Sequence, residues 1–307
     1  MTAPRIAGPR IAGPRIACIG MAALDRTYRM PRLPPGPGKY VASGFSDVGG
    51  GMAATASVAV ARLGGDALWV GRTGDDPAGE WLRAGLAARG VRHLPELVAP
   101  GGITPSSAVL VDPEGERILA VFPGAGLVEQ PRFTLDGVAA VMADPRWPDG
   151  AAHAFALARA MGIPRVLDGE VAAGEALHRL APMADHILFS ERGLREFSGI
   201  EDPAEGLAAI ATRLDAVLAV TIGAAGSLWW RHGEVQPLPA PMVHAVDTTG
   251  CGDVFHGAYA LAIAEGAAVP QAARFATAAA ALKAANGSGW DAAPGRAAVE
   301  ALVATGW

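Results

Sequence analysis

The sequence predicts an α/β protein with a mostly parallel central sheet and helices on both faces. From residue 138 onward, short apolar runs typical of buried strands alternate with helical patterns, an order that favours parallel strands joined by crossover helices. The chain has 307 residues, 51% hydrophobic and 18% charged, which is enough for a full core. A hairpin pattern, Ser106 to Val111 and Arg117 to Phe122, indicates a second, smaller β-sheet.

The first half of the chain begins with Pro-Arg-Ile-Ala repeated three times. Because proline cannot supply the backbone N–H groups of a central strand, only Arg15 to Met21 is predicted as strand, and residues 1–14 are expected to form a disordered extension. One domain then covers residues 15–307. Gly38 to Phe45 alternates as a strand does, and a glycine run precedes a helix over 52–63.

The periodicity of hydrophobic residues, and the Gly and Pro residues that interrupt it, predict the remaining helices and strands. Asp202 and Pro203 stand at the N-cap and first position of one of the helices. The further strands expected are 68–71, 139–143, 165–168, 186–189 and 216–221, and the further helices expected are 79–88, 150–161, 174–180, 191–197, 203–213, 252–265 and 270–285.

Composition excludes several classes of function. The net charge is −5 and there is no basic run, so neither nucleic acid nor an anionic membrane is an expected partner. No uncharged apolar stretch reaches the roughly 18 residues of a membrane span, and the start lacks a signal-peptide core, so we expect a cytoplasmic protein. Cys18 and Cys251 offer neither a disulfide framework nor metal-ligand spacing.

The most informative stretch is Asp247–Gly257, which reads D-T-T-G-C-G-D-V-F-H-G. The apolar, β-prone Met242 to Val246 precedes it and a helical pattern follows, so a strand, a glycine turn and a helix are predicted. Such a turn lets N–H groups at the helix start face one anion. Asp253 lies in the first helical turn, where a carboxylate beside an anion site would suit proton abstraction from an attacking hydroxyl.

This stretch resembles the C-terminal signature of the ribokinase (PfkB-type) family of carbohydrate kinases, D-T-x-G-A-G-D-x-F-x-G, with Cys251 in place of alanine. The resemblance implies a ribokinase-like three-layer α/β/α fold with a small β-sheet lid, here from about 28–47 and 92–122. It implies Asp253 as the catalytic base and Gly250, Cys251 and Gly252 as the anion hole for the transferred phosphoryl group. ATP and Mg²⁺ are the implied cofactors, a monovalent cation stays open, and a homodimer through the lid is expected.

Further segments match the same family. Gly50 and Gly51 stand in its G-G-x-x-x-N motif, with Thr55 where the family has a sugar-binding Asn. Asp25, after the first strand, matches the residue that accepts hydrogen bonds from sugar hydroxyls. We expect the small-molecule sugar to lie between Asp25, Arg146 and Asp253, with Thr55 in the place of the sugar-binding Asn.

The nucleotide side of the site is also implied by resemblance. Thr221, Gly223 and Gly226 fit the T-x-G-x-x-G turn of the family's nucleotide site, and Ser190 is assigned to the same site. The family's N-x-x-E reads Ser190-Glu191-Arg192-Gly193 here. Glu191 is therefore either a substitute that orients Mg²⁺ or a first-turn helix carboxylate.

Longer segments resemble the branch of this family that phosphorylates 6-deoxy-6-sulfofructose, among them Gly38–Ala42 and Ala143–Ala151. In that branch a Lys and an Arg hold the sulfonate, and they match Lys39 and Arg146. Cationic donors at the far end of an anionic ketose are chemically sensible, since Arg offers a bidentate fork. An Asn that also contacts the sulfonate in that branch is replaced by Val121 here. Either this chain holds the anion differently, or its substrate is another C6-anionic ketose, such as a phosphorylated one.

The expected function is transfer of the γ-phosphate of ATP to the C1 hydroxyl of a C6-anionic ketohexose, with 6-deoxy-6-sulfofructose the best candidate. An alternative is a kinase for fructose 6-phosphate, tagatose 6-phosphate or a neutral sugar. A non-catalytic sugar or nucleotide sensor is the alternative from another class.

Overall fold

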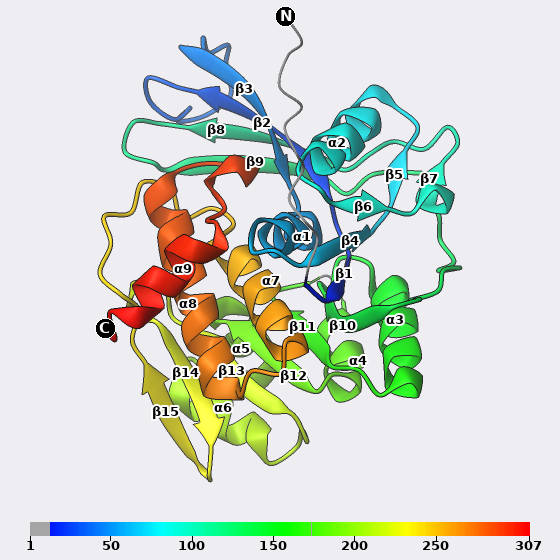
Figure 1. Cartoon of the computed structure of the whole chain (residues 1–307). Helices are drawn as coiled ribbons and strands as arrows, with labels where there is room; N and C mark the ends of the chain where they lie inside the picture. Colours follow the sequence, from blue (N-terminus) through cyan, green and yellow to red (C-terminus); the bar gives the residue numbers. More distant parts are fainter. Residues whose placement is uncertain (1–12, 173) are drawn as a thin grey trace, which may run out of the picture.

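The computed structural model describes residues 13–172 and 174–307, which form a central sheet between two layers of helices, with a small sheet at one end (Figure 1). The central sheet has the strand order β15-β14-β13-β12-β11-β10-β1-β4-β6. Its strands are β1 (Arg15–Ile19), β4 (Asp66–Val70), β6 (Arg92–His93), β10 (Val138–Ala143), β11 (Arg165–Gly169), β12 (His186–Ser190), β13 (Val217–Thr221), β14 (Ser227–Arg231) and β15 (Glu234–Leu238). Neighbours from β13 to β6 pair in parallel, and β14 and β15 pair antiparallel at the edge. The predicted α/β class is confirmed.

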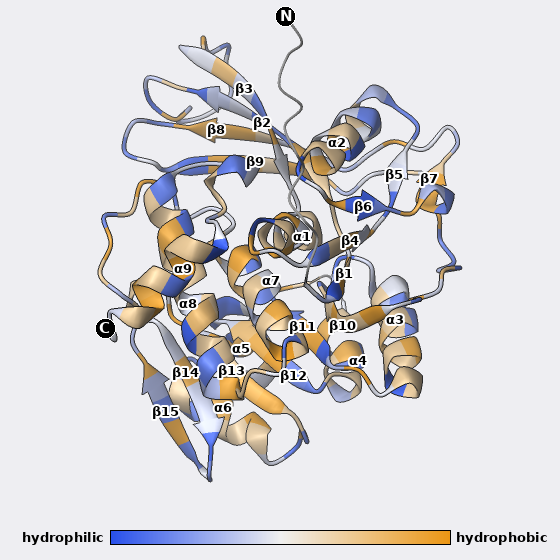
Figure 2. Cartoon of the chain, in the orientation of Figure 1, coloured by the Kyte–Doolittle hydropathy of each residue, from blue (hydrophilic) through white to orange (hydrophobic). Residues whose placement is uncertain are grey.

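Helices cover both faces of this sheet, and successive residues of a strand serve different cores. In β1, Ile16 and Cys18 pack in the core that includes α1, α7 and α8, whereas Ala17 and Ile19 pack in the core that includes α3 and α6. Figure 2 shows hydrophobic residues along the central strands and the helices around them. The helices are α1 (Met52–Arg62), α2 (Pro77–Ala88), α3 (Pro148–Met161), α4 (Ala176–Leu180), α5 (Glu191–Ser198), α6 (Pro203–Ala211), α7 (Cys251–Ala264), α8 (Val269–Asn286) and α9 (Arg296–Ala304).

The small sheet has the order β3-β2-β8-β9 and stands apart from the central sheet (Figure 1). Its strands are β2 (Ala23–Arg29), β3 (Gly44–Gly50), β8 (Ser106–Val111) and β9 (Arg117–Phe122), so the hairpin prediction has the observed bounds. Two short strands, β5 (Thr73–Gly74) and β7 (Val98–Ala99), pair separately. We call the four-stranded sheet the lid.

Three sequence predictions differ from the structure. The strand expected over 38–45 begins only at Gly44, and Asp25 lies inside β2 rather than in a turn after β1. The expected strand at Met242 to Val246 is absent from the structure, and Val246 instead donates its N–H to the Ala284 carbonyl at 2.8 Å. Apolar residues formed no strand there because no partner strand lies beside them.

The predicted extension, residues 1–14, lies outside the described residues except for Gly13 and Pro14. The Pro14 carbonyl accepts the N–H of Asp66 at 3.0 Å, so the order of the sheet begins one residue before β1. The N-cap prediction at Asp202 is confirmed by hydrogen bonds from the Ala204 and Glu205 amides. No helix in the described ranges is long and apolar enough to cross a membrane.

Candidate active site

The signature turn delivers the chain into the N-terminus of α7. Gly250 has φ 78°, a left-handed conformation that favours glycine, and helix α7 starts at the next residue. The Cys251 amide donates to the Thr248 carbonyl at 3.2 Å and the Val254 amide to the Gly250 carbonyl at 3.0 Å. Within the described chain, the Gly252 and Asp253 amides have no protein acceptor. These two N–H groups can therefore receive anionic oxygens.

Asp253 is half-buried beside these amides and lines an open cavity. Burial raises the pKa of Asp253 to about 8, and the neighbouring charge of Asp168 acts in the same direction. A carboxylate with a raised pKa is a stronger proton acceptor than an ordinary Asp. The chemistry of this position therefore fits a general base.

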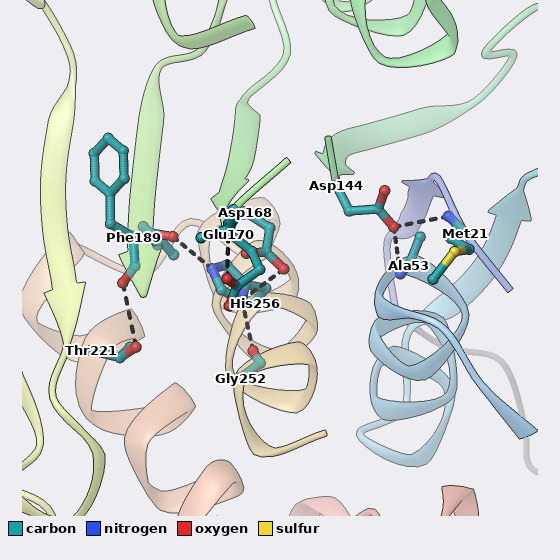
Figure 3. A network of polar contacts seen from close by, with 11 residues as sticks. Met21, Ala53, Asp144, Asp168, Glu170, Phe189, Thr221, Gly252 and His256 are labelled. Carbon is teal, nitrogen blue, oxygen red and sulfur yellow. Dashed lines mark hydrogen bonds and ion pairs between the residues drawn. The ribbon is translucent and has the colours of Figure 1, made fainter. Parts of the chain in front are cut away.

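A buried histidine fixes the first turn of α7 against the central sheet. His256 contacts the Gly252 carbonyl through Nδ1 at 2.7 Å and the Leu188 carbonyl of β12 through Nε2 at 2.9 Å. Asp168, at the end of β11, lies 3.5 Å from Nδ1, and Figure 3 shows these groups together with Glu170. The ring therefore ties the anion-binding end of α7 to the carboxyl ends of two strands.

Asp144 makes a second junction at the end of β10. Its carboxylate accepts the amides of Met21 at 2.9 Å and Ala53 at 3.0 Å (Figure 3). It also accepts the amide of Arg146 at 2.8 Å. Ala53 lies in the first turn of α1, so the carboxylate also complements that helix N-terminus. The junction places the start of α1, with Gly50, Gly51 and Thr55 nearby in sequence, at the edge of the sheet where α7 begins.

The cavity has a volume of about 970 Å³ and lies between the lid and the signature turn. Asp25 lines it from β2 and accepts a hydrogen bond from the Ser107 hydroxyl of β8. Burial raises the pKa of Asp25, while the Ser107 bond opposes that shift. The cavity also contains the predicted Gly50, Gly51, Thr55, Gly250 and Asp253. The structure thus brings Asp25, Gly50, Gly51 and Thr55 into one site with the predicted base, but not the predicted Lys39 and Arg146.

Thr55 is held by a residue distant in sequence. The indole N–H of Trp290 donates to the Thr55 hydroxyl at 3.2 Å, and both residues line the cavity. Thr55 is buried, and its methyl carbon lies 3.3 Å from the position that a side chain at Gly250 would occupy. Thr55 is shorter than the Asn that the family has at this position. Its hydroxyl accepts a hydrogen bond from Trp290, and its methyl group lies beside Gly250 of the signature turn.

The lid touches the signature turn directly. A guanidinium nitrogen of Arg117, on β9, donates to the Thr249 hydroxyl, and Arg117 and Arg29 both line the cavity. Thr249 is itself fixed by its amide, which donates to the Asp247 carboxylate at 2.8 Å. The contact joins the lid to the signature turn at the cavity, which both residues line.

The predicted nucleotide residues lie at the carboxyl ends of β12 and β13. Ser190 caps α5 by accepting the Gly193 amide at 3.0 Å, and the Thr221 hydroxyl donates to the Phe189 carbonyl at 3.3 Å. Gly223 and Gly226 bound a short 3₁₀ turn, in which Gly226 is buried and has φ 103°. Carboxyl ends of parallel strands are where α/β sheets bind ligands.

Glu191 is exposed in the first turn of α5. In the described part of the chain, no three His, Cys, Asp or Glu side chains gather as a metal cluster. The role of Glu191 in orienting Mg²⁺ stays a prediction.

The structure does not place Lys39 and Arg146, the two predicted anion-binding residues, in this cavity. Lys39 and Arg146 are both exposed, and neither is among the described residues that line the cavity. Lys39 precedes β3 in an irregular segment, and Arg146 follows β10. The charge of Arg146 reaches Asp168 and Asp144, where it opposes the rise in their pKa values that burial causes.

Sequence reasoning missed several residues of this site. Arg117, Trp290 and Lys283 line the cavity, and Asp168 and His256 support α7. No local motif marks them because their partners lie far along the chain. His256 had one usable signal, since it follows Asp253 by three residues and so shares its helical face.

Comparison with known proteins agrees with the site. The model of the pfkB family carbohydrate kinases matches residues 14–294. A fructokinase of Klebsiella pneumoniae is 34% identical over 244 residues, covering 73% of this chain and 78% of its own length. A ribokinase of Bacillus subtilis (strain 168) is 29% identical and covers 93% of this chain and 98% of its own.

Solved structures show the same fold. An Agrobacterium tumefaciens protein with a provisional ribokinase name superposes with a TM-score of 0.89 at 36% identity, covering 96% of this chain and 98% of its own. An Arabidopsis thaliana ribokinase complexed with ribose and ATP has a TM-score of 0.81 at 24% identity, covering 95% and 99%. Fold and site together define a phosphotransferase of the ribokinase-like class. The chain belongs to the pfkB family of carbohydrate kinases and is an ATP-dependent sugar kinase, which excludes the sensor alternative.

Proposed function

We propose that this kinase transfers the γ-phosphate of ATP to the C1 hydroxyl of a ketohexose that carries an anionic group at C6, with 6-deoxy-6-sulfofructose the leading candidate. The observation that supports the reaction is the shared cavity of Asp25 and Asp253. Asp25 would accept hydrogen bonds from sugar hydroxyls, and Asp253 would take the proton of the attacking hydroxyl. The free amides of Gly252 and Asp253 would hold the phosphoryl oxygens in transfer.

Mg²⁺ bound with the nucleotide would neutralise phosphate charge. Glu191, at the N-terminus of α5, is the protein group assigned to it, and Ser190, Thr221, Gly223 and Gly226 are assigned to the nucleotide. The lid would exclude water from the cavity during transfer, since water is a competing acceptor.

The anionic substrate is supported by the positive charges that face the cavity. Arg29 and Arg117 line it from the lid, and Lys39 and Arg146, which the resemblance assigns to the anion, are exposed residues that do not line it. Guanidinium groups bind sulfonate or phosphate oxygens through paired N–H donors. An anionic group on the sugar would give the cavity's guanidinium groups a charged partner.

The role of Asp253 is tested by Asp253→Asn. This variant keeps the size of the side chain but cannot accept a proton, so kcat should fall by about 10²–10⁴-fold while sugar affinity remains. Asp215→Asn, at an exposed position outside the cavity, is the matched control. Sugar binding measured by calorimetry shows whether the site of the variant is intact. If Asp253→Asn retains turnover, Asp253 is not the catalytic base.

The substrate class is tested by measuring ADP release with 6-deoxy-6-sulfofructose, fructose 6-phosphate, tagatose 6-phosphate, fructose and ribose. We expect kcat/KM to favour the anionic ketoses and to fall for them in Lys39→Ala and Arg146→Ala. The fructokinase and ribokinase relatives make a neutral sugar the second candidate. Preference for fructose or ribose, unchanged in both variants, would establish that candidate.

We also infer a homodimer that pairs through the lid. Strand β9 exposes Ile118, Leu119, Val121 and Phe122, and Phe45 is exposed on β3. These side chains lie on the two edge strands of the lid and, within β9, on both of its faces. Exposed apolar side chains on edge strands are typical of an association surface. Light scattering should give the mass of two chains for the native protein and of one chain for Val121→Lys; a native monomer at micromolar concentration would reject the dimer.

A further inference from the structure

Lys283 is a buried cation for which the proposed reaction gives no role. It lies in the last turn of α8 with 1% of its surface exposed, and it lines the active-site cavity. Among the 25 Lys and Arg residues of the chain, only Lys39 and Lys283 are lysines. Charged side chains are seldom buried without a specific partner. The ammonium of Lys283 therefore needs an explanation.

The partner of Lys283 is the segment that leaves α8. Its Nζ donates to the Gly287 carbonyl at 2.6 Å, and Gly287 has φ 106°, a conformation that glycine adopts readily. The carbonyls at a helix C-terminus carry partial negative charge, which favours a cation at this place. Capping of α8 alone would account for this one bond.

The next residue connects α8 to the signature turn. The Ala284 carbonyl accepts the amides of Val246 at 2.8 Å and Asp247 at 3.1 Å. Burial opposes ionisation of Asp247, but hydrogen bonds from Thr249 and Ser288 and the charge of Lys283 lower its pKa. The ammonium thus lies close enough to act on the turn, although the described structure has no direct Lys283–Asp247 ion pair within 4.0 Å.

Charge balance gives this arrangement a purpose. Asp247 carries a negative charge in the same turn whose Gly252 and Asp253 amides would receive phosphoryl oxygens, so the carboxylate and the phosphate would repel each other. A positive charge behind the turn offsets that repulsion, and inside a protein such charges are only weakly screened. Lysine suits this task because its ammonium is a compact point charge.

A free monovalent cation does not fit beside this lysine. Such an ion would need carbonyl and carboxylate oxygens, and the Gly287 carbonyl is already bound by Nζ at 2.6 Å. A second positive charge would also meet the fixed ammonium. The positive charge at this place is therefore the ammonium of Lys283 itself and not a bound ion.

We propose that Lys283 is a positioning residue whose tethered ammonium supplies the positive charge behind the signature turn, so that phosphoryl transfer by this chain needs no added monovalent cation. The proposal rests on the proposed kinase function. It deepens that function by assigning a role to a buried group that the proposed reaction does not use.

The first test measures kcat with the best sugar in choline, sodium, potassium and ammonium chlorides at equal ionic strength. The native enzyme should vary by less than about twofold, because nonspecific screening is held constant. Lys283→Met should lose about tenfold or more in choline and recover at least part of the loss in potassium or ammonium. Arg159→Met, which removes an exposed charge from α3, should respond to cations as the native enzyme does.

The second test measures ADP binding by calorimetry without sugar, which separates this proposal from the choice of substrate. Potassium should tighten ADP binding to Lys283→Met and leave the native affinity unchanged. If no sugar is phosphorylated while this pattern holds, the proposed function fails and the role of Lys283 stands. Thermal unfolding checks that the variant is folded, and the native cation titration remains decisive if it is not.

Two results would overturn the proposal. One is strong activation of the native enzyme by potassium, which would show that a free cation is still required. The other is a folded Lys283→Met whose kcat and ADP affinity are either native in choline or lowered without recovery in any cation. That outcome would reduce Lys283 to a cap of α8.

Discussion

The carboxylate of Asp25 occupies the space beside Gly50 that a side chain would need. A Cβ atom at Gly50 would lie 2.1 Å from Oδ2 of Asp25, far inside van der Waals contact. The two residues are not a directly paired couple in the lid, since Asp25 pairs with Val48 across β2 and β3. The Asp25 side chain, which lines the cavity, therefore requires glycine at position 50, and this explains one element of the G-G-x-x-x-N motif.

Gly50→Ala should displace Asp25 and weaken sugar binding more than it weakens the fold. We expect KM for the sugar to rise by about tenfold or more, because a hydrogen bond to a charged group contributes about 1.5–3 kcal/mol. Gly36→Ala is the control, since a Cβ atom there meets no atom within 4 Å. Equal sugar KM values in the two variants would contradict this account of Gly50.

The pKa of Asp253 predicts the acid limb of the rate profile. A base must be deprotonated to act, and its raised pKa of about 8 means that kcat/KM should fall as pH decreases below about 8. The charge of Asp168 is one cause of that rise, so Asp168→Asn should move the midpoint toward lower pH. Asp215→Asn is the matched control. The measurement is log kcat/KM against pH, and a midpoint near 4 in the native enzyme would contradict the assignment.

The two glycines of the turn should respond differently to alanine. Gly250 has φ 78°, where a side chain costs about 1–2 kcal/mol, so Gly250→Ala should lower both the free energy of unfolding and kcat. Gly252 lies inside α7 and its Cβ position is open, so Gly252→Ala should preserve or raise stability. Its methyl group would instead project where the phosphoryl oxygens are expected, lowering kcat alone. Chemical denaturation and single-turnover kinetics separate the two effects.

The sequence was most informative where structure is local. Apolar period placed most central strands and helices, and the bounds of the β8–β9 hairpin followed from alternation and its turn residues. The signature stretch identified Asp253 because a glycine turn and a first-turn carboxylate are encoded within a few residues. The same reasoning failed at Met242 to Val246, where apolar composition was read as a strand although these residues cross the surface beside α8.

Contacts between distant segments were beyond such reasoning. Trp290 and Thr55 are 235 positions apart, and Arg117 and Thr249 are 132 apart. Neither pair has a sequence signal of its own, because one joins α1 to the segment after α8 and the other joins β9 to the turn before α7. The same holds for Lys283, which in sequence is an ordinary helix-end lysine.

Arg117 supplies the last prediction, because its guanidinium joins the lid to the signature turn through Thr249. Arg117→Met keeps the aliphatic stem and removes both the positive charge and the donor. We expect kcat/KM to fall by about 5–50-fold through looser closure of the cavity, with little change in stability because the side chain is exposed.

Arg26→Met tests whether any loss of charge from the lid has this effect. Arg26 lies on β2 in an exposed ion pair with Asp47 and is not among the described residues that line the cavity. Its variant should keep native kcat/KM. If the cavity opens in Arg117→Met, ATP hydrolysis without sugar should also increase, because water then competes as the acceptor. Native kinetics and native hydrolysis in Arg117→Met would show that the contact with Thr249 does not control closure.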